Sequence, residues 1–211
     1  MSMKTLVIST DMPDAIAQAV AVLTAGGLVA FPTDTVYGVG AHALLPDAVK
    51  RLFAAKVRPE GKAIPLLLGE AADLERVSCD VPALAWRLIA ALWPGALTLV
   101  VPRGPLLPHI VTAGGPSVAV RLPDHALPRT LAQRLGAPLA ATSANLSGQA
   151  AAITADAVLA QLDGRIELLL DGGPCAGGVA STVVDLTVQP PAILRPGALD
   201  LARLRRLLAA D

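Results

Sequence analysis

The sequence predicts an α/β fold: a single domain in which a twisted mixed sheet with flanking helices surrounds a cationic cleft. Helix-like and strand-like segments alternate along most of the chain, which is typical of α/β domains. Strand-like segments crowd together toward the carboxyl end, which indicates a mixed sheet and not a purely parallel one. No repeat or long polar linker divides residues 1–211, and we therefore expect one domain.

The predicted helices carry apolar residues at helical spacing between recognisable start and stop signals. The first follows two capping candidates, Thr10 and Asp11, and stops at Gly26. The second has Pro46 in its first turn, where a missing N–H costs nothing. The predicted helices are residues 14–25, 46–55, 83–92, 126–135, 155–162 and 199–210.

The predicted strands are short apolar runs bounded by turn residues. The amino terminus leads directly into a strand-like segment around Leu6, and Pro65 indicates an edge strand or an irregular start for another. Residues 104–115 are rich in proline and glycine and predict a loop. The remaining strands are predicted at residues 28–31, 64–68, 96–101, 117–122, 138–141, 166–170, 182–186 and 192–194.

Composition excludes several classes of protein. Hydrophobic residues make up 54% of the chain and charged residues only 16%, which argues against disorder. With 2% aromatic residues, the core must be aliphatic. No apolar run approaches the roughly 20 residues that a membrane span needs, and the amino terminus lacks the features of a signal peptide. We expect a cytoplasmic protein.

Histidine and cysteine give no sign of a metal site. Cys79 and Cys175 have no metal-ligand spacing and predict an incidental reduced pair. The three histidines are scattered along the chain. Net charge is zero, which weakens the case for broad nucleic-acid binding, although five cations fall within thirteen residues: Lys50, Arg51, Lys56, Arg58 and Lys62.

Residues 142–148, with the sequence TSANLSG, are the most informative segment. They follow the apolar run 138–141, and small polar residues just past the carboxyl end of a strand are well placed to bind ligands in α/β sheets. Ser143 can donate to a phosphate oxygen, and Asn145 can both donate and accept. A polar turn that satisfies its own backbone is the structural alternative.

Similar segments follow other predicted strands or helices. Residues 31–40 place Thr33, Asp34 and Thr35 after a buried strand. Residues 56–62 place three cations at a helix end, where they could bind phosphate or simply complement the helix dipole. Residues 177–185 add further hydroxyl groups.

Two arginines complete the set. Arg121 shares a strand face with Ser117 and Ala119, and an arginine on such a face needs an anionic partner. Arg195 looks buried as well. Together these segments predict a cleft rich in Arg, Lys, Ser and Thr, suited to a polyanion such as ATP, with catalysis by positioning and charge neutralisation. The chain has no Ser-His-Asp arrangement, P-loop or kinase motif set.

The ordered series of segments resembles the YrdC/TsaC family, the threonylcarbamoyl-AMP synthases of tRNA modification, and this resemblance implies a YrdC-like fold. The matching segments run in family order across nearly the whole chain. Because the chain ends soon after Arg195, it resembles the short form without an additional carboxy-terminal domain. The segments are residues 31–40, 56–59 with Lys62, 93–98, 118–123, 143–148, 181–185 and 195–197.

The resemblance implies a nucleotidyltransferase that uses L-threonine, bicarbonate or CO2, and ATP. Carboxylated threonine attacks the α-phosphate to give threonylcarbamoyl-AMP and pyrophosphate, with Mg²⁺ accompanying the phosphates. Partner proteins then transfer the threonylcarbamoyl group to an adenosine of tRNA.

The resemblance also implies roles for individual residues, none of them a metal ligand. Lys56, Arg58 and Asn145 would line the reacting centre. The residues expected to contact threonine are Thr35, Arg121, Ala141 and Ser181. The residues expected to contact ATP are Arg58, Lys62, Ser117, Ser143, Ala151 and Arg195. Three positions depart from the commoner pattern, namely Leu67, Ala96 and Thr142, of which Leu67 bears on a threonine contact.

Two other functions stay open at this point. The cations between Lys50 and Lys62 could form a surface for double-stranded RNA or tRNA. A related domain handles carbamoyl-adenylate in hydrogenase maturation, but 211 residues leave no room for the zinc-finger and acylphosphatase-like regions of that pathway.

Overall fold

The computed structural model describes residues 4–59 and 61–209. Its strands are β1 (Leu6–Ser9), β2 (Val29–Phe31), β3 (Gly38–His42), β4 (Leu66–Leu67), β5 (Leu97–Pro102), β6 (Ser117–Arg121), β7 (Leu139–Ser143), β8 (Leu168–Asp171), β9 (Thr182–Asp185) and β10 (Ala192–Arg195). Its helices are α1 (Ala15–Thr24), α2 (Pro46–Ala55), α3 (Leu74–Val77), α4 (Ala83–Leu92), α5 (Ala126–Leu135), α6 (Ala155–Leu162) and α7 (Leu201–Ala209), with 3-10 turns η1 (Ala71–Asp73) and η2 (His109–Thr112).

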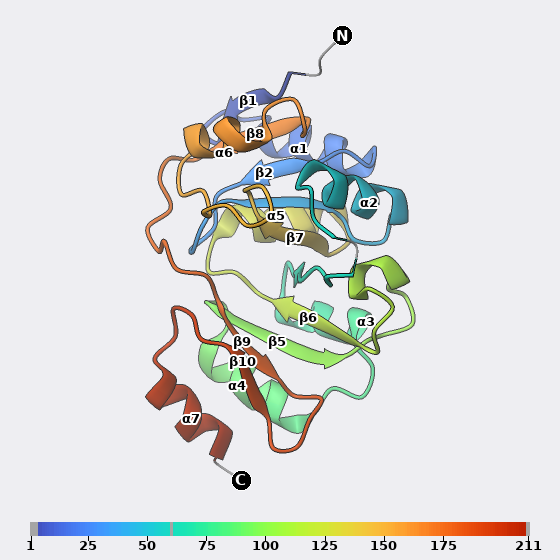
Figure 1. Cartoon of the computed structure of the whole chain (residues 1–211), viewed down its shortest axis with the longest axis vertical. Coiled ribbons are helices and arrows are strands. Elements are labelled where there is room, and N and C mark those ends of the chain that lie inside the picture. The colour runs from blue at the N-terminus through green and yellow to red at the C-terminus, as the bar shows by residue number, and fades with distance from the viewer. Residues whose placement is uncertain (1–3, 60, 210–211) are drawn as a thin grey trace.

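All ten strands join one mixed sheet in the order β1-β8-β2-β3-β7-β4-β6-β5-β9-β10, which confirms the predicted fold class. The pairs β1–β8, β2–β8, β4–β6 and β5–β9 are parallel, and the other pairs are antiparallel. The strands succeed one another down the long axis of the molecule, from β1 near the amino terminus to β9 and β10 beside α7 (Figure 1).

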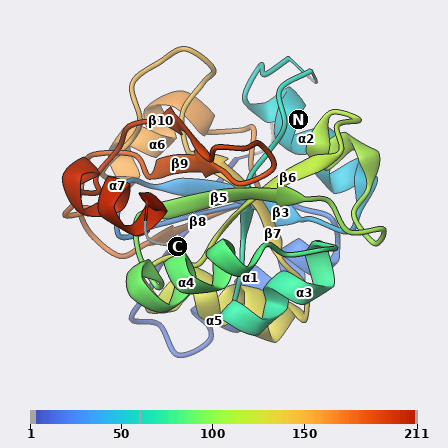
Figure 2. The same ribbon diagram turned by 90° about the horizontal axis from the view of Figure 1, so that it is seen from below.

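The sheet buries its two faces in separate aliphatic clusters. Val29, Phe31 and Leu139 enter a cluster that α1 and α5 cover. Alternate residues of the sheet, such as Ala30 and Val120, enter a larger cluster with residues of α2, α4 and α6. Helices flank the sheet on both sides, with α1, α3, α4 and α5 gathered on one side of the molecule and α2 and α6 on the other (Figure 2).

The strand β3 was not predicted from the sequence. It lies in the middle of the sheet, paired with β2 and β7, although its sequence GVGAH resembles a turn. A Cβ atom at Gly38 or Gly40 would lie 3.1 Å from the ring of Phe31, so glycine lets that ring lie flat on the strand. The two glycines therefore serve close packing, and the strand forms because its neighbours pair with it.

Four local predictions are corrected. The N-cap of α1 is Asp14, not Thr10 or Asp11. The strand with Pro65 before it, β4, lies centrally between β7 and β6, so the irregular start was right and the edge position wrong. The loop 104–115 contains η2, and the final helix begins at Leu201; residue 210 of its predicted range lies outside the described residues.

Within residues 4–59 and 61–209, none of the helices has the length and apolar character required to cross a bilayer.

Candidate active site

A cleft that is partly open to solvent lies where the two halves of the sheet meet. Its walls come from the loop after β2, the end of β7, the start of β4, the end of β6 and the segment before β9. Six residues with serine or threonine hydroxyl groups line it: Thr33, Thr35, Thr98, Thr142, Ser143 and Ser181. Arg121 and Arg195 add positive charge, and Leu67 and Ala141 contribute apolar surface.

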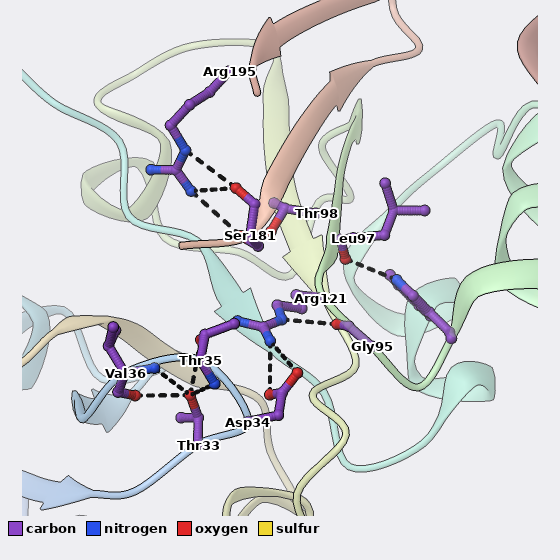
Figure 3. Close-up of polar contacts among 11 residues, drawn as sticks. Thr33, Asp34, Thr35, Val36, Gly95, Leu97, Thr98, Arg121, Ser181 and Arg195 are labelled. Atoms are coloured by element: carbon purple, nitrogen blue, oxygen red, sulfur yellow. Dashed lines mark hydrogen bonds and ion pairs between the residues drawn. The ribbon is translucent and has the colours of Figure 1, made fainter. Parts of the chain in front are cut away.

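Arg121 is the central cation of the cleft, and only 6% of it is exposed. Its Nη2 donates to both carboxylate oxygens of Asp34, at 2.7 and 2.6 Å, so the anionic partner predicted for this arginine is Asp34. Nε donates to the Gly95 carbonyl at 2.9 Å and Nη1 to Thr35 Oγ1 at 3.0 Å (Figure 3). Burial lowers the pKa of Arg121 and Asp34 opposes that effect, while the guanidinium stays charged.

The loop after β2 is held by Thr33. Its hydroxyl donates to the Val36 carbonyl at 2.7 Å and lies 3.0 Å from Thr35 Oγ1. The same oxygen accepts from the backbone N–H of Thr35 at 3.1 Å. This local network fixes the Thr35 hydroxyl against Arg121, as the two side chains in Figure 3 show.

Ser181 forms the opposite wall with two partners from neighbouring strands. Its hydroxyl lies 2.8 Å from Thr98 Oγ1, and both oxygens of Ser181 accept from Arg195 Nη2, at 2.9 and 3.3 Å (Figure 3). A Cβ atom at Gly197 would lie 2.3 Å from the Ala180 carbonyl oxygen, so only glycine lets the chain just after β10 approach this closely. Arg195 is exposed, which corrects the expectation that it is buried.

Lys56 lies beneath the polar segment 142–148, with 2% of its surface exposed. Its ammonium donates to the backbone carbonyls of Ser143 and Asn145, and its own carbonyl accepts from the Ser147 N–H at 2.9 Å. Burial, and to a lesser degree the nearby Arg58, lower the pKa of Lys56 to about 8. These hydrogen bonds from the buried side of the segment therefore hold its backbone in place.

One polar atom of Asn145 has no hydrogen-bond partner among the described residues. Its Nδ2 donates to the carbonyls of Leu146 and Gln149, both at 2.8 Å. Its buried Oδ1 accepts no hydrogen bond from any residue that the structure describes. A buried acceptor without a partner calls for an explanation, and a donor group of a bound ligand would supply one.

The structure brings six of the twelve predicted site residues to the cleft wall. Thr35, Arg121, Ala141, Ser143, Ser181 and Arg195 line it. Arg58 lies beyond Lys56, donating to the carbonyls of Lys62 and Ala63 at 3.3 and 2.8 Å, and burial lowers its pKa. Ser117 starts β6, at the end of the strand opposite Arg121, and Ala151 is exposed in the loop before α6.

Asp34 and Tyr37 are at the site, but sequence reasoning assigned neither of them a role. Asp34 is the counter-ion of Arg121, and its position between two threonines after a strand was the only sequence signal for it. Tyr37 lines the cleft although its own surface is fully buried. It is the only tyrosine of the chain, and in a chain so poor in aromatic residues this rarity was the available signal.

The cleft supplies little to a metal ion directly. None of its lining residues within the described ranges is an aspartate or glutamate. Those ranges also contain no group of three or more His, Cys, Asp or Glu residues arranged to hold a metal.

Comparison with known proteins assigns the family. The model of the Sua5, YciO and YrdC proteins, described as "Telomere recombination", matches residues 21–197. The chain belongs to the Sua5/YciO/YrdC family. This membership confirms the resemblance inferred from the sequence motifs.

Family members with assigned names lie close in sequence and structure. The threonylcarbamoyl-AMP synthase of Pyrococcus abyssi is 43% identical over 183 residues, which cover 87% of this chain and 54% of that protein. The threonylcarbamoyl-AMP synthase of Bacillus subtilis is 43% identical over 202 residues, covering 95% and 58%. The crystal structure of P. abyssi Sua5 complexed with L-threonine superposes with a TM-score of 0.94 at 40% identity, covering 97% of this chain and 61% of that one. The chain thus spans little more than half the length of these relatives.

Proposed function

We propose that this chain is a threonylcarbamoyl-AMP synthase, a nucleotidyltransferase that forms threonylcarbamoyl-AMP and pyrophosphate from L-threonine, bicarbonate or CO2, and ATP. The product would serve partner proteins that transfer the threonylcarbamoyl group to an adenosine of tRNA. One observation carries the proposal: arginine and hydroxyl side chains converge in one cleft of a chain whose family includes a threonine-bound structure.

In the proposed reaction, the amine of threonine adds to CO2 and loses a proton to form a carbamate. A carbamate oxygen then attacks the α-phosphorus of ATP. The bond from phosphorus to the bridging oxygen breaks, and its electron pair leaves with pyrophosphate. The cleft lining described above has no histidine or cysteine nucleophile, so we assign catalysis to binding and charge neutralisation.

The threonine end of the cleft would be formed by Thr35, Arg121, Ala141 and Ser181. Arg121 already donates to Gly95, Thr35 and Asp34, which leaves one Nη1 hydrogen without a partner among the described contacts. We propose that this hydrogen, with the hydroxyls of Thr35 and Ser181, holds the polar groups of threonine. The apolar side chains of Leu67 and Ala141 suit its methyl group.

The phosphate end would be formed by Ser143 and Arg195 at the cleft wall, with Arg58 and Lys62 on the loop after α2. Lys56 would hold the Ser143 and Asn145 backbone in place for the substrate. Asn145 Oδ1 offers an acceptor to a substrate N–H. Ser117 and Ala151, which lie outside the cleft wall, would contact ATP only at its periphery.

Mg²⁺ fits this proposal as a companion of ATP. Because no carboxylate lines the cleft within the described ranges, the ion would be held mainly by phosphate oxygens and water. Bound there, it would neutralise phosphate charge.

The test is release of pyrophosphate from ATP by the purified chain. We expect little release with ATP alone and strong stimulation by threonine together with bicarbonate. Serine should be a poorer substrate, since a missing methyl forfeits roughly 1–3 kcal/mol in a fitted apolar pocket. Release that is independent of the amino acid, or of bicarbonate, would remove the proposal.

The structure gives less support to RNA binding as the main activity. Within the cluster between Lys50 and Lys62, Lys50 pairs with Asp47 and Arg51 pairs with Glu167. These acidic partners offset two of the five cations. We therefore propose at most a weak contact with tRNA, which a salt-dependent gel shift beside the pyrophosphate assay would measure.

A further inference from the structure

A glycine-rich segment, residues 172–181, links β8 to β9, and its last two residues, Ala180 and Ser181, line the cleft; we call it the glycine-rich wall. Gly172, Gly173, Gly177 and Gly178 lie in it, and residues 176–180 are exposed. The segment rests on the loop after β2: Gly178 donates its backbone N–H to the Thr35 carbonyl at 2.7 Å, and a Cβ atom at Gly177 would lie 2.5 Å from the Asp34 carbonyl oxygen. Its last residue, Ser181, faces the cleft. The position of this wall therefore sets the width of the site.

The glycine-rich wall is fastened to the sheet at its first two residues by Tyr37. The phenol hydroxyl donates to the Gly173 carbonyl at 2.8 Å and accepts from the Gly172 N–H at 3.3 Å. Asp171 supports the same turn, because its Oδ1 accepts from the Gly173 N–H at 3.0 Å. Burial raises the pKa of Tyr37 to about 12, which keeps the hydroxyl protonated and able to donate.

The backbone of Tyr37 joins two more parts of the site. Its N–H donates to the Ala152 carbonyl at 2.9 Å, and its carbonyl accepts from the Ala144 N–H at 2.8 Å. Ala144 lies between Ser143 and Asn145 in the segment that Lys56 supports. A single buried residue thus contacts the glycine-rich wall, the polar segment and the loop before α6.

We propose that Tyr37 is a positioning residue: its hydroxyl fastens the glycine-rich wall so that Ser181 stands opposite Thr35 and Arg121. At the far end of the wall, Thr98 and Arg195 hold Ser181. Between the two ends, the backbone N–H groups of Cys175 and Gly178 donate to the Ile153 and Thr35 carbonyls. The Ala180 carbonyl also accepts from the Ala198 N–H at 3.0 Å. Without the Tyr37 hydroxyl, the first turn of this glycine-rich segment keeps only the Asp171 side chain as support, and the segment gains freedom to move.

The kinetic test replaces Tyr37 by phenylalanine, which keeps the buried ring and removes the hydroxyl. This kinetic test rests on the proposed function, because it assumes that threonine binds beside Ser181. Losing one ordinary hydrogen bond should raise KM for threonine about fivefold to tenfold. KM for ATP should change by less than about twofold, since the glycine-rich wall meets the threonine end of the cleft. Equal increases for both substrates, or for neither, would overturn the positioning role.

Cys175 gives a second measurement that does not depend on any enzyme activity. It lies in the glycine-rich wall with 8% of its surface exposed, whereas Cys79, the other cysteine, is exposed. Burial raises the pKa of the Cys175 thiol, so it should react slowly with a maleimide while the wall is closed. In a Cys79→Ser background, the maleimide should label Cys175 at least about fivefold faster when Tyr37 is replaced by phenylalanine, because the loss of one ordinary hydrogen bond corresponds to about that factor.

A matched control separates positioning from general loss of stability. Thr5 is also a buried hydroxyl that donates to a carbonyl, that of Ile166 at 2.9 Å, and accepts from a glycine N–H, that of Gly164 at 3.0 Å. Thr5→Val should lower the melting temperature without changing the labelling of Cys175 or KM for threonine. If Thr5→Val speeds the labelling as much as Tyr37→Phe does, the inference fails.

A second variant keeps the test decisive if Tyr37→Phe folds poorly. Asp171→Ala removes the other side chain that supports the turn at Gly173, and it should speed the labelling of Cys175 in the same way. Labelling at the wild-type rate in both variants overturns the role of Tyr37. If wild-type turnover proves independent of threonine, the proposed function fails, and the labelling rates still decide the role of Tyr37.

Discussion

Lys56 shows most clearly how one residue couples stability to the chemistry of the site. Its ammonium is almost fully buried and donates to the carbonyls of Ser143 and Asn145. The described contacts give it no carboxylate partner, so desolvation, with a smaller effect of Arg58, lowers its pKa to about 8 from the ordinary 10.5 despite the two carbonyl acceptors. The charged ammonium of Lys56 therefore lowers the free energy of unfolding.

This cost predicts a pH dependence of stability. Between pH 8 and pH 10.5 the unfolded chain keeps the proton on Lys56 and the folded chain releases it, so stability should rise with pH through this window. In Lys56→Met this titration is absent. The unfolding free energy of the wild type, relative to Lys56→Met, should increase by roughly 3 kcal/mol across the window. Urea unfolding at a series of pH values measures the unfolding free energy of the wild type and of Lys56→Met. If the two free energies change with pH in parallel, the prediction of a buried charge at Lys56 is contradicted.

At the scale of the element, the end of α2 holds a residue in an unfavourable conformation. Val57 follows the helix with φ +52°, in the left-handed region that a β-branched side chain rarely adopts. The Arg58 N–H donates to the Phe53 carbonyl at 3.0 Å, closing a helix end at which glycine is usual. The turn separates Lys56, which contacts the polar segment, from Arg58, which donates to carbonyls of its own loop.

Val57→Gly should therefore stabilise the protein. Relief of the left-handed conformation gains about 1–2 kcal/mol, and the greater freedom of glycine in the unfolded chain takes back about 0.5–1 kcal/mol. We expect a net gain of about 0.5–1 kcal/mol in urea unfolding by these two effects. Val57→Ala serves as the control, because it keeps a Cβ atom and should gain less. The strain would be disproved by a glycine variant less stable than the wild type.

The elements also show what the sequence could and could not predict. Strands with continuous apolar runs, such as β8, and helices with marked ends, such as α5, were predicted because local pattern determines them. The strand β3 was missed, since its glycines matter only once the Phe31 ring lies on them. The anion required by Arg121 was predicted in kind, but Asp34 could not be identified because 87 residues separate the two.

At the scale of the whole molecule, the cleft joins two halves of one sheet. Thr35, Ala141 and Ser143 belong to the half that runs from β1 to β7, and Arg121 and Ser181 to the half that runs from β4 to β10. The central strand β4 has only two residues, so side chains across the cleft add to the join. The Asp34–Arg121 ion pair is the main charged link between the halves.

Breaking this ion pair should therefore affect the whole fold. The side chains of Arg121 and Asp34 are 8% and 17% exposed, and removing one partner of a buried pair typically costs about 3–5 kcal/mol. Asp34→Ala should lower the unfolding free energy by an amount in this range. The control is Asp47→Ala, which breaks the exposed pair with Lys50 and should cost less than about 1 kcal/mol.

A double variant shows whether the cost comes from the unpaired charge. Asp34→Ala with Arg121→Met removes both charges, so the loss should be well below the sum of the two single losses, by about 1–3 kcal/mol. Threonine should raise the melting temperature of the wild type but not of the double variant, because Arg121 belongs to the proposed threonine end of the cleft. Additive losses in urea unfolding would show that the ion pair contributes no coupling between the halves, and that their packing alone holds the cleft together.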